Sequence, residues 1–411
     1  MKVLWLSHLI PFPPKAGVSL RSYHLIKQLA QRCDLDLLAF NQKDLMGGFY
    51  DDIDEGLRDA RADMSQFCRI LDIVELDCDK HAHGNKILAL KSLFTEAPYN
   101  INWLQSKAFR QALQKALAEN QYDLIHLDTI SFTAHMDLLE GQCLTMDHHN
   151  IESHMLLRRA DKESNAFKAW YFRQEGRRLQ AYEEKYCPQM SVNVTCSRED
   201  SDRLKAFLPE AVTAEIPNGV DIEYFQPMPE IQSVPTRLVF VGTLSWYPNA
   251  EAVEYIAKHW DALKQRHPDL IVDIIGANPP QSIVALGERE ADFRVHGFVD
   301  DIRPMIAEAG IYVCPIMDGG GTKLKLLDAF AMGKAVLAHP IACEGLKVVD
   351  GESVLLADTD DAFLAGIDRL VADDALRQHL EQGSRRLAEA EYGYDAIGEA
   401  LHRLYEKVIS E

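Results

Sequence analysis

Short apolar runs alternate with longer amphipathic segments along almost the whole chain of 411 residues. Apolar runs bounded by polar residues predict buried strands, and segments with apolar residues three and four positions apart predict helices. The predicted strands are KVLWLSH, LDLLAF, IVELD, YDLIHLD and CLTMDHH in the first half, and RLVFVGT, LIVDIIG, FRVHGFV, GIYVCPI and KAVLAHP in the second. This alternation is typical of α/β proteins with parallel sheets.

The strand pattern restarts after residue 217, which predicts two domains. A proline-rich segment, AEIPNGVDIEYFQPMPEIQSVP, marks the seam. We expect an N-terminal domain over 1–217 and a C-terminal domain over 218–392, with a helix over 393–411 that packs back on the first. Each domain is expected to be a doubly wound, Rossmann-like unit, which binds ligands at the carboxyl ends of its strands.

Composition and charge narrow the possible functions. The net charge of −20 argues against nucleic acid as a partner, because a phosphate backbone needs a basic surface. Eight cysteines without a CxxC pair predict reduced thiols, and the start MKVLWLSHLIPFPP lacks the features of a secretory signal. We therefore expect a cytoplasmic protein. Residues 1–190 carry 23 Lys and Arg against 26 Asp and Glu, so this nearly neutral half can approach an anionic surface.

The stretch CPIMDGGGTKLKLLDAFAMGKAV joins a predicted strand, a glycine-rich loop and a predicted helix. Three consecutive glycines leave room for a ligand: Gly319, Gly320 and Gly321. Thr322 is expected to cap the helix, so that the N–H groups of Lys323 and Leu324 point out of its positively polarised end. The charge of Lys323 suits a phosphate or diphosphate. The alternative is an ordinary strand-to-helix turn with solvated lysines.

A pair of histidines ends the predicted strand CLTMD, in the segment TMDHHNIESH. A histidine at the carboxyl end of a strand in an α/β protein favours a role in ligand binding. His148 and His149 are both candidates for this role. Neighbours on a strand point to opposite faces, so the two histidines cannot simply share a metal ion.

Six short motifs follow one another along the chain: PFPPKAGVSLR, VTCS, IPNGVD, VGTLSWYPN, HGFVDDI and GGGTKLKLLDAFAMGKAV. In this order they resemble the retaining GT-B glycosyltransferases of family 4, especially the exopolysaccharide- and envelope-associated subgroup with GTxxWxPN and GGGTxxK. The resemblance covers nearly the whole chain. It implies two Rossmann-like domains that face across a cleft, and transfer of a sugar from a nucleotide diphosphate to an acceptor hydroxyl with retention of configuration.

The resemblance also implies roles for single residues. His149 and Asn150 would position the sugar, Lys323 would stabilise the leaving diphosphate, and Asp328 would accept hydrogen bonds from the ribose. The other donor-binding residues that it implies are Gly17, Arg21, Gly242, Thr243, Val299, Gly319, Gly320, Gly321, Thr322 and Leu324. It implies no cofactor and no metal.

The chain departs from the family at three positions that matter for catalysis. Thr243 and Pro248 stand where relatives carry the Arg and Lys of GRLxxxKG, and Gly320 stands where they carry a glutamate. We interpret this as a relocated phosphate cation, supplied by Lys323 and in addition Lys325. The alternatives are a catalytically inactive homologue that still binds nucleotide sugars, and an epimerase or hydrolase of nucleotide sugars.

The expected partners are a nucleotide-sugar donor and a glycan or lipid-linked acceptor. The segment KILALKSLFTEAPYNINWLQ mixes large apolar residues with two lysines. A helix and loop that face the core are the preferred interpretation, and the alternative is an amphipathic patch that receives a lipid-linked acceptor at the inner face of a membrane.

Overall fold

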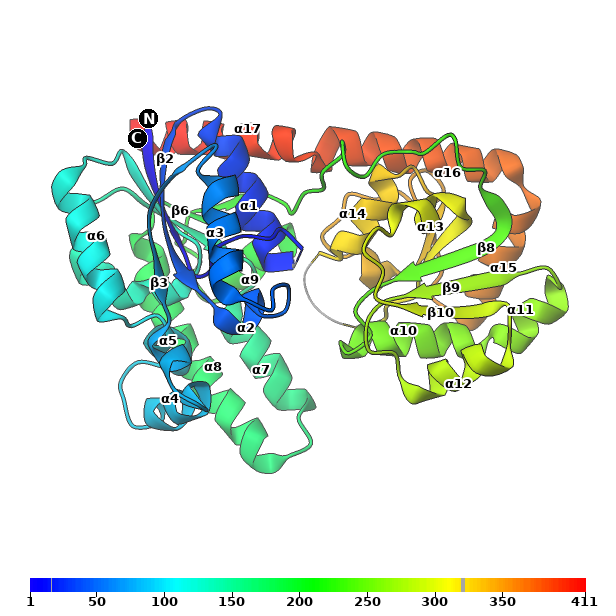
Figure 1. Ribbon diagram of the computed structural model, residues 1–411, viewed down its shortest axis with the longest axis horizontal. Coiled ribbons are helices and arrows are strands. Elements are labelled where there is room, and N and C mark those ends of the chain that lie inside the picture. The colour runs from blue at the N-terminus through cyan, green and yellow to red at the C-terminus, as the bar shows by residue number, and fades with distance from the viewer. Residues whose placement is uncertain (16, 319–321) are drawn as a thin grey trace. The chain divides into compact units, whose positions relative to one another are not determined.

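The computed structural model describes residues 1–15, 17–318 and 322–411, and these fall into two compact units (Figure 1). Unit 1 comprises residues 1–217 and 397–411, and unit 2 comprises residues 218–396. No helix in the described ranges is both long enough and apolar enough to cross a membrane.

Unit 1 is built on a seven-stranded parallel sheet in the order β3-β2-β1-β4-β5-β6-β7. The strands are β1 Lys2–Ser7, β2 Asp34–Asn41, β3 Arg69–Glu75, β4 Leu124–Leu127, β5 Leu144–His148, β6 Val192–Thr195 and β7 Thr213–Glu215. Alternate residues of the central strands enter two separate apolar clusters: Val3 and Trp5 belong to one, Leu4 and Leu6 to the other. Both faces of the sheet are therefore covered, as parallel sheets require.

Helices cover both faces of this sheet. The helices of unit 1 are α1 Gly17–Ala30, α2 Lys43–Met46, α3 Ile53–Met64, α4 Gly84–Ser92, α5 Tyr99–Trp103, α6 Lys107–Glu119, α7 Glu152–Lys162, α8 Ala166–Tyr186, α9 Arg198–Phe207 and α17 Tyr394–Ser410. Helices α1, α3 and α17 pack on the face that carries Trp5, and α6, α8 and α9 on the other. Side-chain caps fix several helix starts, as where Ser106 accepts a hydrogen bond from Phe109 N at α6.

Unit 2 is built on a six-stranded parallel sheet in the order β10-β9-β8-β11-β12-β13. Its strands are β8 Val234–Val241, β9 Ile271–Ile275, β10 Phe293–Gly297, β11 Ala309–Cys314, β12 Val336–Ala338 and β13 Leu355–Leu356. Its helices are α10 Tyr247–Lys258, α11 Trp260–Arg266, α12 Gln281–Arg289, α13 Arg303–Glu308, α14 Leu324–Ala331, α15 Asp360–Ala372 and α16 Asp374–Leu387.

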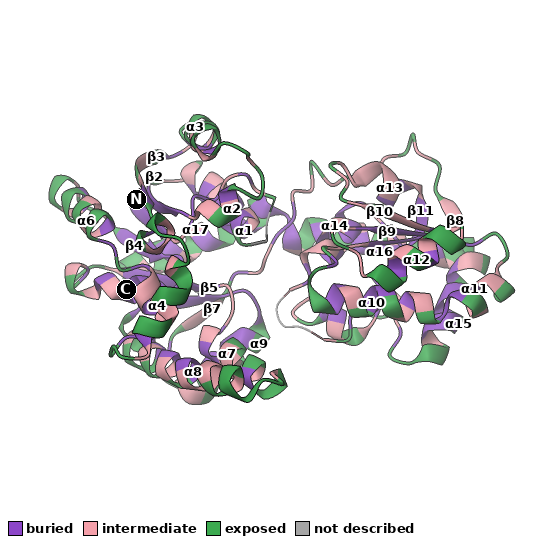
Figure 2. Ribbon diagram, turned by 60° about the horizontal axis from the view of Figure 1, so that its bottom comes forward, coloured by how far each residue is buried: buried purple, intermediate pink, exposed green. Residues whose placement is uncertain are grey.

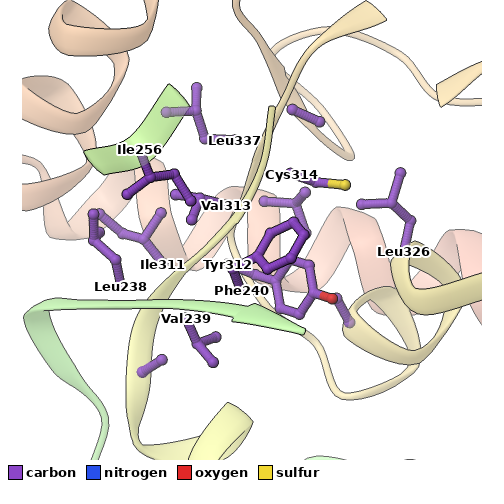
Figure 3. Packing of buried hydrophobic residues seen from close by; sticks show 14 of the residues in the cluster. Leu238, Val239, Phe240, Ile256, Ile311, Tyr312, Val313, Cys314, Leu326 and Leu337 are labelled. Atoms are coloured by element: carbon purple, nitrogen blue, oxygen red, sulfur yellow. The ribbon is translucent and has the colours of Figure 1, made fainter. Parts of the chain in front are cut away.

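Strands β8 and β11 and helix α14 pack together in the core of unit 2. Phe240 of β8, Tyr312 of β11 and Leu326 of α14 are fully buried in one cluster (Figure 3). The apolar face of α14 thus anchors this short helix beside the carboxyl ends of two central strands.

The predicted fold class is confirmed: both units are parallel, Rossmann-like α/β sheets. Every strand that the apolar runs predict is present. The runs do not predict β6, β7 and β13, which have four residues or fewer and carry too short an apolar pattern.

Candidate functional site

A buried carboxylate organises the carboxyl ends of three strands in unit 1. Asp128 directly follows β4, and its carboxylate accepts hydrogen bonds from Ser7 Oγ at 3.0 Å and Ser22 Oγ at 3.1 Å. The same carboxylate contacts His8 Nδ1 at 2.8 Å and His149 Nε2 at 3.2 Å. We call these five residues the Asp128 cluster. Its members come from β1, α1, β4 and the turn after β5, so it forms where the topology of an α/β sheet predicts a ligand site.

The charges of the Asp128 cluster support one another. Burial by itself raises the pKa of Asp128, but the charge of His8 and the hydrogen bond from His149 outweigh it and hold that pKa well below its usual value. Burial likewise opposes protonation of His149, yet the hydrogen bond and charge of Asp128 raise its pKa. An ionised carboxylate therefore favours a protonated His149.

The two adjacent histidines have different environments. His148 is buried, and its Nε2 contacts Asn193 Oδ1 at 3.1 Å; burial lowers its pKa. His149 turns the other way, to Asp128, as the alternation along a strand requires. The structure thus places His149 in the polar cluster and His148 in the interior, while Asn150 is half-buried directly after them.

Arg21 occupies a buried position in α1. Its guanidinium forms a two-pronged ion pair with Asp147 of β5, at 2.8 and 3.0 Å, and donates to the carbonyl of Pro217 at 3.0 Å. This pair lies beside the Asp128 cluster, since the charge of Arg21 opposes protonation of His149. Gly17 begins the same helix, so the predicted loop residue is the first residue of α1.

Part of the Asp128 cluster has the composition of a metal site. One ligand atom each from His8, Asp128 and His149 lies within 4.8 Å of the other two. Two imidazoles and a carboxylate are ligands that zinc or iron accepts. The same atoms hydrogen-bond to one another, which satisfies the carboxylate without an ion. Metal independence stays a prediction.

In unit 2, backbone segments meet tightly at the carboxyl ends of β8, β9 and β10. Gly242 N donates to Ile275 O at 2.9 Å, and Gly276 N donates to Gly297 O at 2.7 Å. A Cβ at Gly276 would collide with the carbonyl oxygen of Gly242. Glycine is therefore needed where these strands end, and Gly242 and Thr243 are held at a fixed place. Val299, in the loop after β10, packs against the core of this unit.

The start of α14 differs from the expectation. Lys323, not Thr322, occupies the N-cap position, and no side chain caps the helix. The buried hydroxyl of Thr322 finds no hydrogen-bond partner among the described residues. The prediction that Thr322 caps the helix is therefore wrong, because the helix begins one residue later, at Leu324. Three further predicted residues, Gly319, Gly320 and Gly321, lie outside the described residues.

Two titratable side chains of α14 point back toward the sheet. Lys325 donates a hydrogen bond to Asn249 Oδ1, and burial lowers the pKa of Lys325 to about 8. Burial raises the pKa of Asp328 to about 7, and the charge of Lys325 acts against this rise. Lys323, whose side chain is buried, lies close enough to lower the pKa of Lys325 further. The structure therefore gathers Thr243, Lys323 and Asp328 near the carboxyl ends of β8 and β11.

Six residues of these clusters were not among the principal predicted site residues: Ser7, His8, Ser22, Asp128, Asn249 and Lys325. His8 and Asp128 each follow a strand directly, and this signal was available in SH and LD at the ends of two predicted strands. The contact between Asn249 and Lys325 joins residues 76 positions apart, and no local pattern predicts it.

Comparison with known proteins finds glycosyltransferases similar to both units of this chain. The model described as "Glycosyl transferases group 1" matches residues 235–373, within unit 2. The model described as "Glycosyltransferase Family 4" matches residues 72–224, nearly all within unit 1. The phosphatidyl-myo-inositol mannosyltransferase of Mycolicibacterium smegmatis is 25% identical over 371 residues, which make up 86% of this chain and 88% of the relative.

Solved structures share the fold over the full length. The sucrose-phosphate synthase of Thermosynechococcus elongatus superposes with a TM-score of 0.70 at 17% identity, covering 100% of both chains. HepE of Anabaena, solved in complex with UDP, gives a TM-score of 0.66 at 14% identity and covers 99% of this chain and 100% of its own. Both halves of the chain therefore match glycosyltransferase models, and the solved structures share its fold of two parallel-sheet, Rossmann-like domains of the GT-B type.

Proposed function

We propose that this glycosyltransferase moves a sugar from a nucleotide diphosphate to an acceptor hydroxyl, with retention of the anomeric configuration. One observation carries the proposal. In the unit that matches the group 1 model, the first turn of α14, its lysines and Asp328 gather at the carboxyl ends of β8 and β11. A helix N-terminus with lysines suits a diphosphate, and a neighbouring carboxylate suits ribose hydroxyls.

The chemistry follows from charge development in the transition state. As the bond between sugar and phosphate breaks, negative charge grows on the departing diphosphate. The start of α14, including Thr322 and Leu324, and the charge of Lys323 stabilise this charge. The departing phosphate oxygen takes the acceptor's proton, so no separate general base is required. His149 and Asn150 remain our candidates for contacts with the sugar, and the backbone at Val299 for contacts with the nucleobase.

The relatives support a nucleotide-sugar donor without defining it. HepE of Anabaena was solved with UDP, and the similar curated enzyme is a phosphatidyl-myo-inositol mannosyltransferase. We propose a nucleotide diphosphate sugar as the donor and a glycan or lipid-linked acceptor in polysaccharide or envelope-glycan synthesis. No metal or cofactor enters the proposed mechanism.

Product analysis tests this function. A thermal-shift screen of UDP-, GDP- and TDP-sugars should find a donor, because ligand binding stabilises the folded state by mass action. With that donor and candidate acceptors, NMR of the product should show transfer with the donor's anomeric configuration. Conversion of the donor without an acceptor would instead indicate an epimerase or hydrolase. Binding without any conversion would indicate an inactive homologue.

An exposed apolar surface in unit 1 supports peripheral contact with a membrane. Leu90 of α4 is 62% exposed, and Phe94, two residues after this helix, is 84% exposed. Helix α4 is largely exposed (Figure 2), which favours the patch over the core-facing interpretation. Lys86 and Lys91 accompany these side chains, and lysines with exposed aromatic residues are typical of interfacial helices.

Vesicle binding tests the membrane contact. The protein should co-sediment with vesicles that contain anionic phospholipid, and the double variant Leu90→Ser/Phe94→Ser should bind several-fold less, because both apolar side chains would otherwise enter the lipid. Val212→Ser provides the control, since Val212 is exposed elsewhere in unit 1. Equal binding by all three proteins would contradict the contact.

A further inference from the structure

Lys325 leaves its own helix and reaches the end of a central strand. Although it lies in the first turn of α14, its Nζ lies 4.9 Å from the centre of the Phe240 ring in β8. It also donates a hydrogen bond to the side chain of Asn249 in α10. The ammonium group thus sits at the carboxyl end of β8, beside the loop that contains Thr243.

The surrounding residues form a defined seat for this ammonium group. Asn249 is buried, and its Nδ2 donates to Thr243 O at 2.8 Å, which turns Oδ1 toward Lys325. A Cβ at Gly242 would collide with Lys325 Nζ and lie 2.8 Å from Asn249 Nδ2. A larger residue at 242 would displace the ammonium group from this position, so the three residues form one seat.

The charge of Lys325 is not neutralised within the described part of unit 2. No carboxylate there forms an ion pair with its Nζ; Asp328 acts on it only at longer range. The exposed Lys347, by contrast, pairs with Glu391 at 2.6 Å. Lys325 is half-buried, so its ammonium group is partly withdrawn from water without a counter-ion, and an anion placed against it would offset that cost.

We propose that Lys325, seated by Asn249 against Gly242, is the residue that binds the diphosphate of the donor. This inference rests on the proposed function and adds one specific residue to it, Lys325 of α14. A cation from α14 thereby serves the loop after β8, residues 242–246, which contains no lysine or arginine of its own. Lys323 then acts mainly as the first residue of the helix terminus, and Asn249 is a positioning residue.

Binding should be coupled to a proton. The titratable groups that face Lys325 are Lys323 and Asp328 from α14 and Cys314 from β11. The neighbours from β8 and α10, Phe240 and Asn249, do not titrate. Because the pKa of Lys325 is lowered to about 8, part of the free protein lacks this charge at pH 8.5. A bound diphosphate favours the charged form, so binding takes up a proton, and affinity falls as the pH rises through about 8.

Calorimetry on the full chain tests this inference. UDP, GDP and TDP are titrated into the protein at pH 8.5 in buffers of different ionisation enthalpy, which reports protons taken up on binding. Wild type should take up a fraction of a proton, and Lys325→Arg should bind without uptake, because arginine is always charged. Lys325→Met should lose on the order of tenfold in affinity or more. Lys334→Met is the control, since Lys334 is buried and its pKa is also lowered to about 8.

The outcomes separate this inference from the proposed function. If wild type binds no nucleoside diphosphate, the proposed function fails. If wild type binds one but Lys325→Met binds it equally well, only the assignment of Lys325 fails. Should Lys325→Met not fold, as judged by thermal unfolding, Lys325→Arg decides. Proton uptake equal to wild type in that variant overturns the assignment, and its absence supports it.

Discussion

At the scale of single residues, Asp128 ties together segments that are far apart in the sequence. Its carboxylate bonds to residues of β1, of α1 and of the turn after β5, so one buried charge sets the orientation of both His8 and His149. A carboxylate with this many partners costs little to bury, whereas removing its charge leaves the histidines without an acceptor of equal strength.

Replacing Asp128 should change the titration of His149. Burial lowers the pKa of His149, and in Asp128→Asn no carboxylate opposes this effect, so the pKa of His149 should fall below its wild-type value. The variant should also lose about 3 kcal/mol of stability. NMR titration of the imidazole and urea unfolding measure the two effects. Asp137→Asn is the matched control, because Asp137 is exposed and bonds to Arg110. An unchanged His149 titration would contradict the assigned contact.

The burial of Asp328 predicts a specific pH dependence of stability. Burial raises the pKa of Asp328 from 3.8 to about 7. At a pH between these two values, the Asp328 carboxyl is protonated in the folded state and ionised in the unfolded state. The free energy of unfolding should therefore fall as the pH rises from about 4 to about 7. In Asp328→Asn this contribution disappears.

Urea unfolding at a series of pH values measures this effect in the asparagine variant. Glu183 in unit 1, whose pKa burial also raises to about 7, contributes a slope of the same sign. Glu183→Gln should therefore remove only its own share, and the double variant should remove both. Parallel curves for wild type and Asp328→Asn would show that Asp328 is not desolvated in the folded protein.

Site residues could be predicted from the sequence where they directly follow a strand. The motif DHHN indicated His149, and the alternation along a strand explains why His148 points inward instead. Lys325 was harder to assign than Lys323, because the choice depends on how a long side chain folds back across the sheet. Its contact with Asn249 depends on the packing of α10 against β8, which a linear pattern does not contain.

At the scale of elements, the loops after the strands of unit 2 are fixed by close backbone packing. Gly276 after β9 lies against the carbonyl of Gly242 after β8, and Gly297 accepts a hydrogen bond from Gly276. The elements themselves were predictable from apolar runs, apart from the shortest strands. The start of α14 was not: threonine is a favoured N-cap residue and lysine is not, yet Lys323 holds that position while Leu326 in the first turn is buried in the core.

A substitution at Gly276 should disturb this packing. In Gly276→Ala the new Cβ would meet backbone rather than a flexible side chain, so the strand ends must shift, and we expect a loss of about 2 kcal/mol or more in the stability of unit 2. Gly297→Ala is the comparison: its φ of 66° disfavours alanine by about 1 kcal/mol, but a Cβ there meets nothing within 4 Å. Chemical unfolding measures both, and an equal loss in the two variants would contradict the proposed collision.

At the scale of the whole molecule, the sequence of unit 2 lies between the two segments of the chain that form unit 1. Helix α17 adds Ile397, Leu401 and Tyr405 to the core of unit 1, and Tyr405 Oη hydrogen-bonds to His126 Nδ1 at 2.6 Å. The restart of the strand pattern after residue 217 indicated two α/β sheets, because the periodicity of a sheet is local. How two such sheets assemble into one enzyme depends on contacts that no periodicity encodes.

Shortening one side chain of α17 should therefore affect unit 1 selectively. Leu401 is fully buried, so Leu401→Ala should cost about 2–5 kcal/mol in unit 1 and little in unit 2. Hydrogen exchange followed by mass spectrometry resolves the two units. Lys407→Ala, on the exposed side of the same helix, should leave both unchanged. Equal loss of protection in both units would show that they unfold as one.

The position of α17 has a consequence for synthesis on the ribosome. Residues 1–217 emerge first, but their core stays open on the side where Leu401 and Tyr405 belong until α17 has been translated and is free to pack. Unit 2 is complete earlier, although its residues are translated later. The order in which the two units become able to fold is thus the reverse of the order in which they are made, and the nascent first unit must wait with part of its apolar surface uncovered.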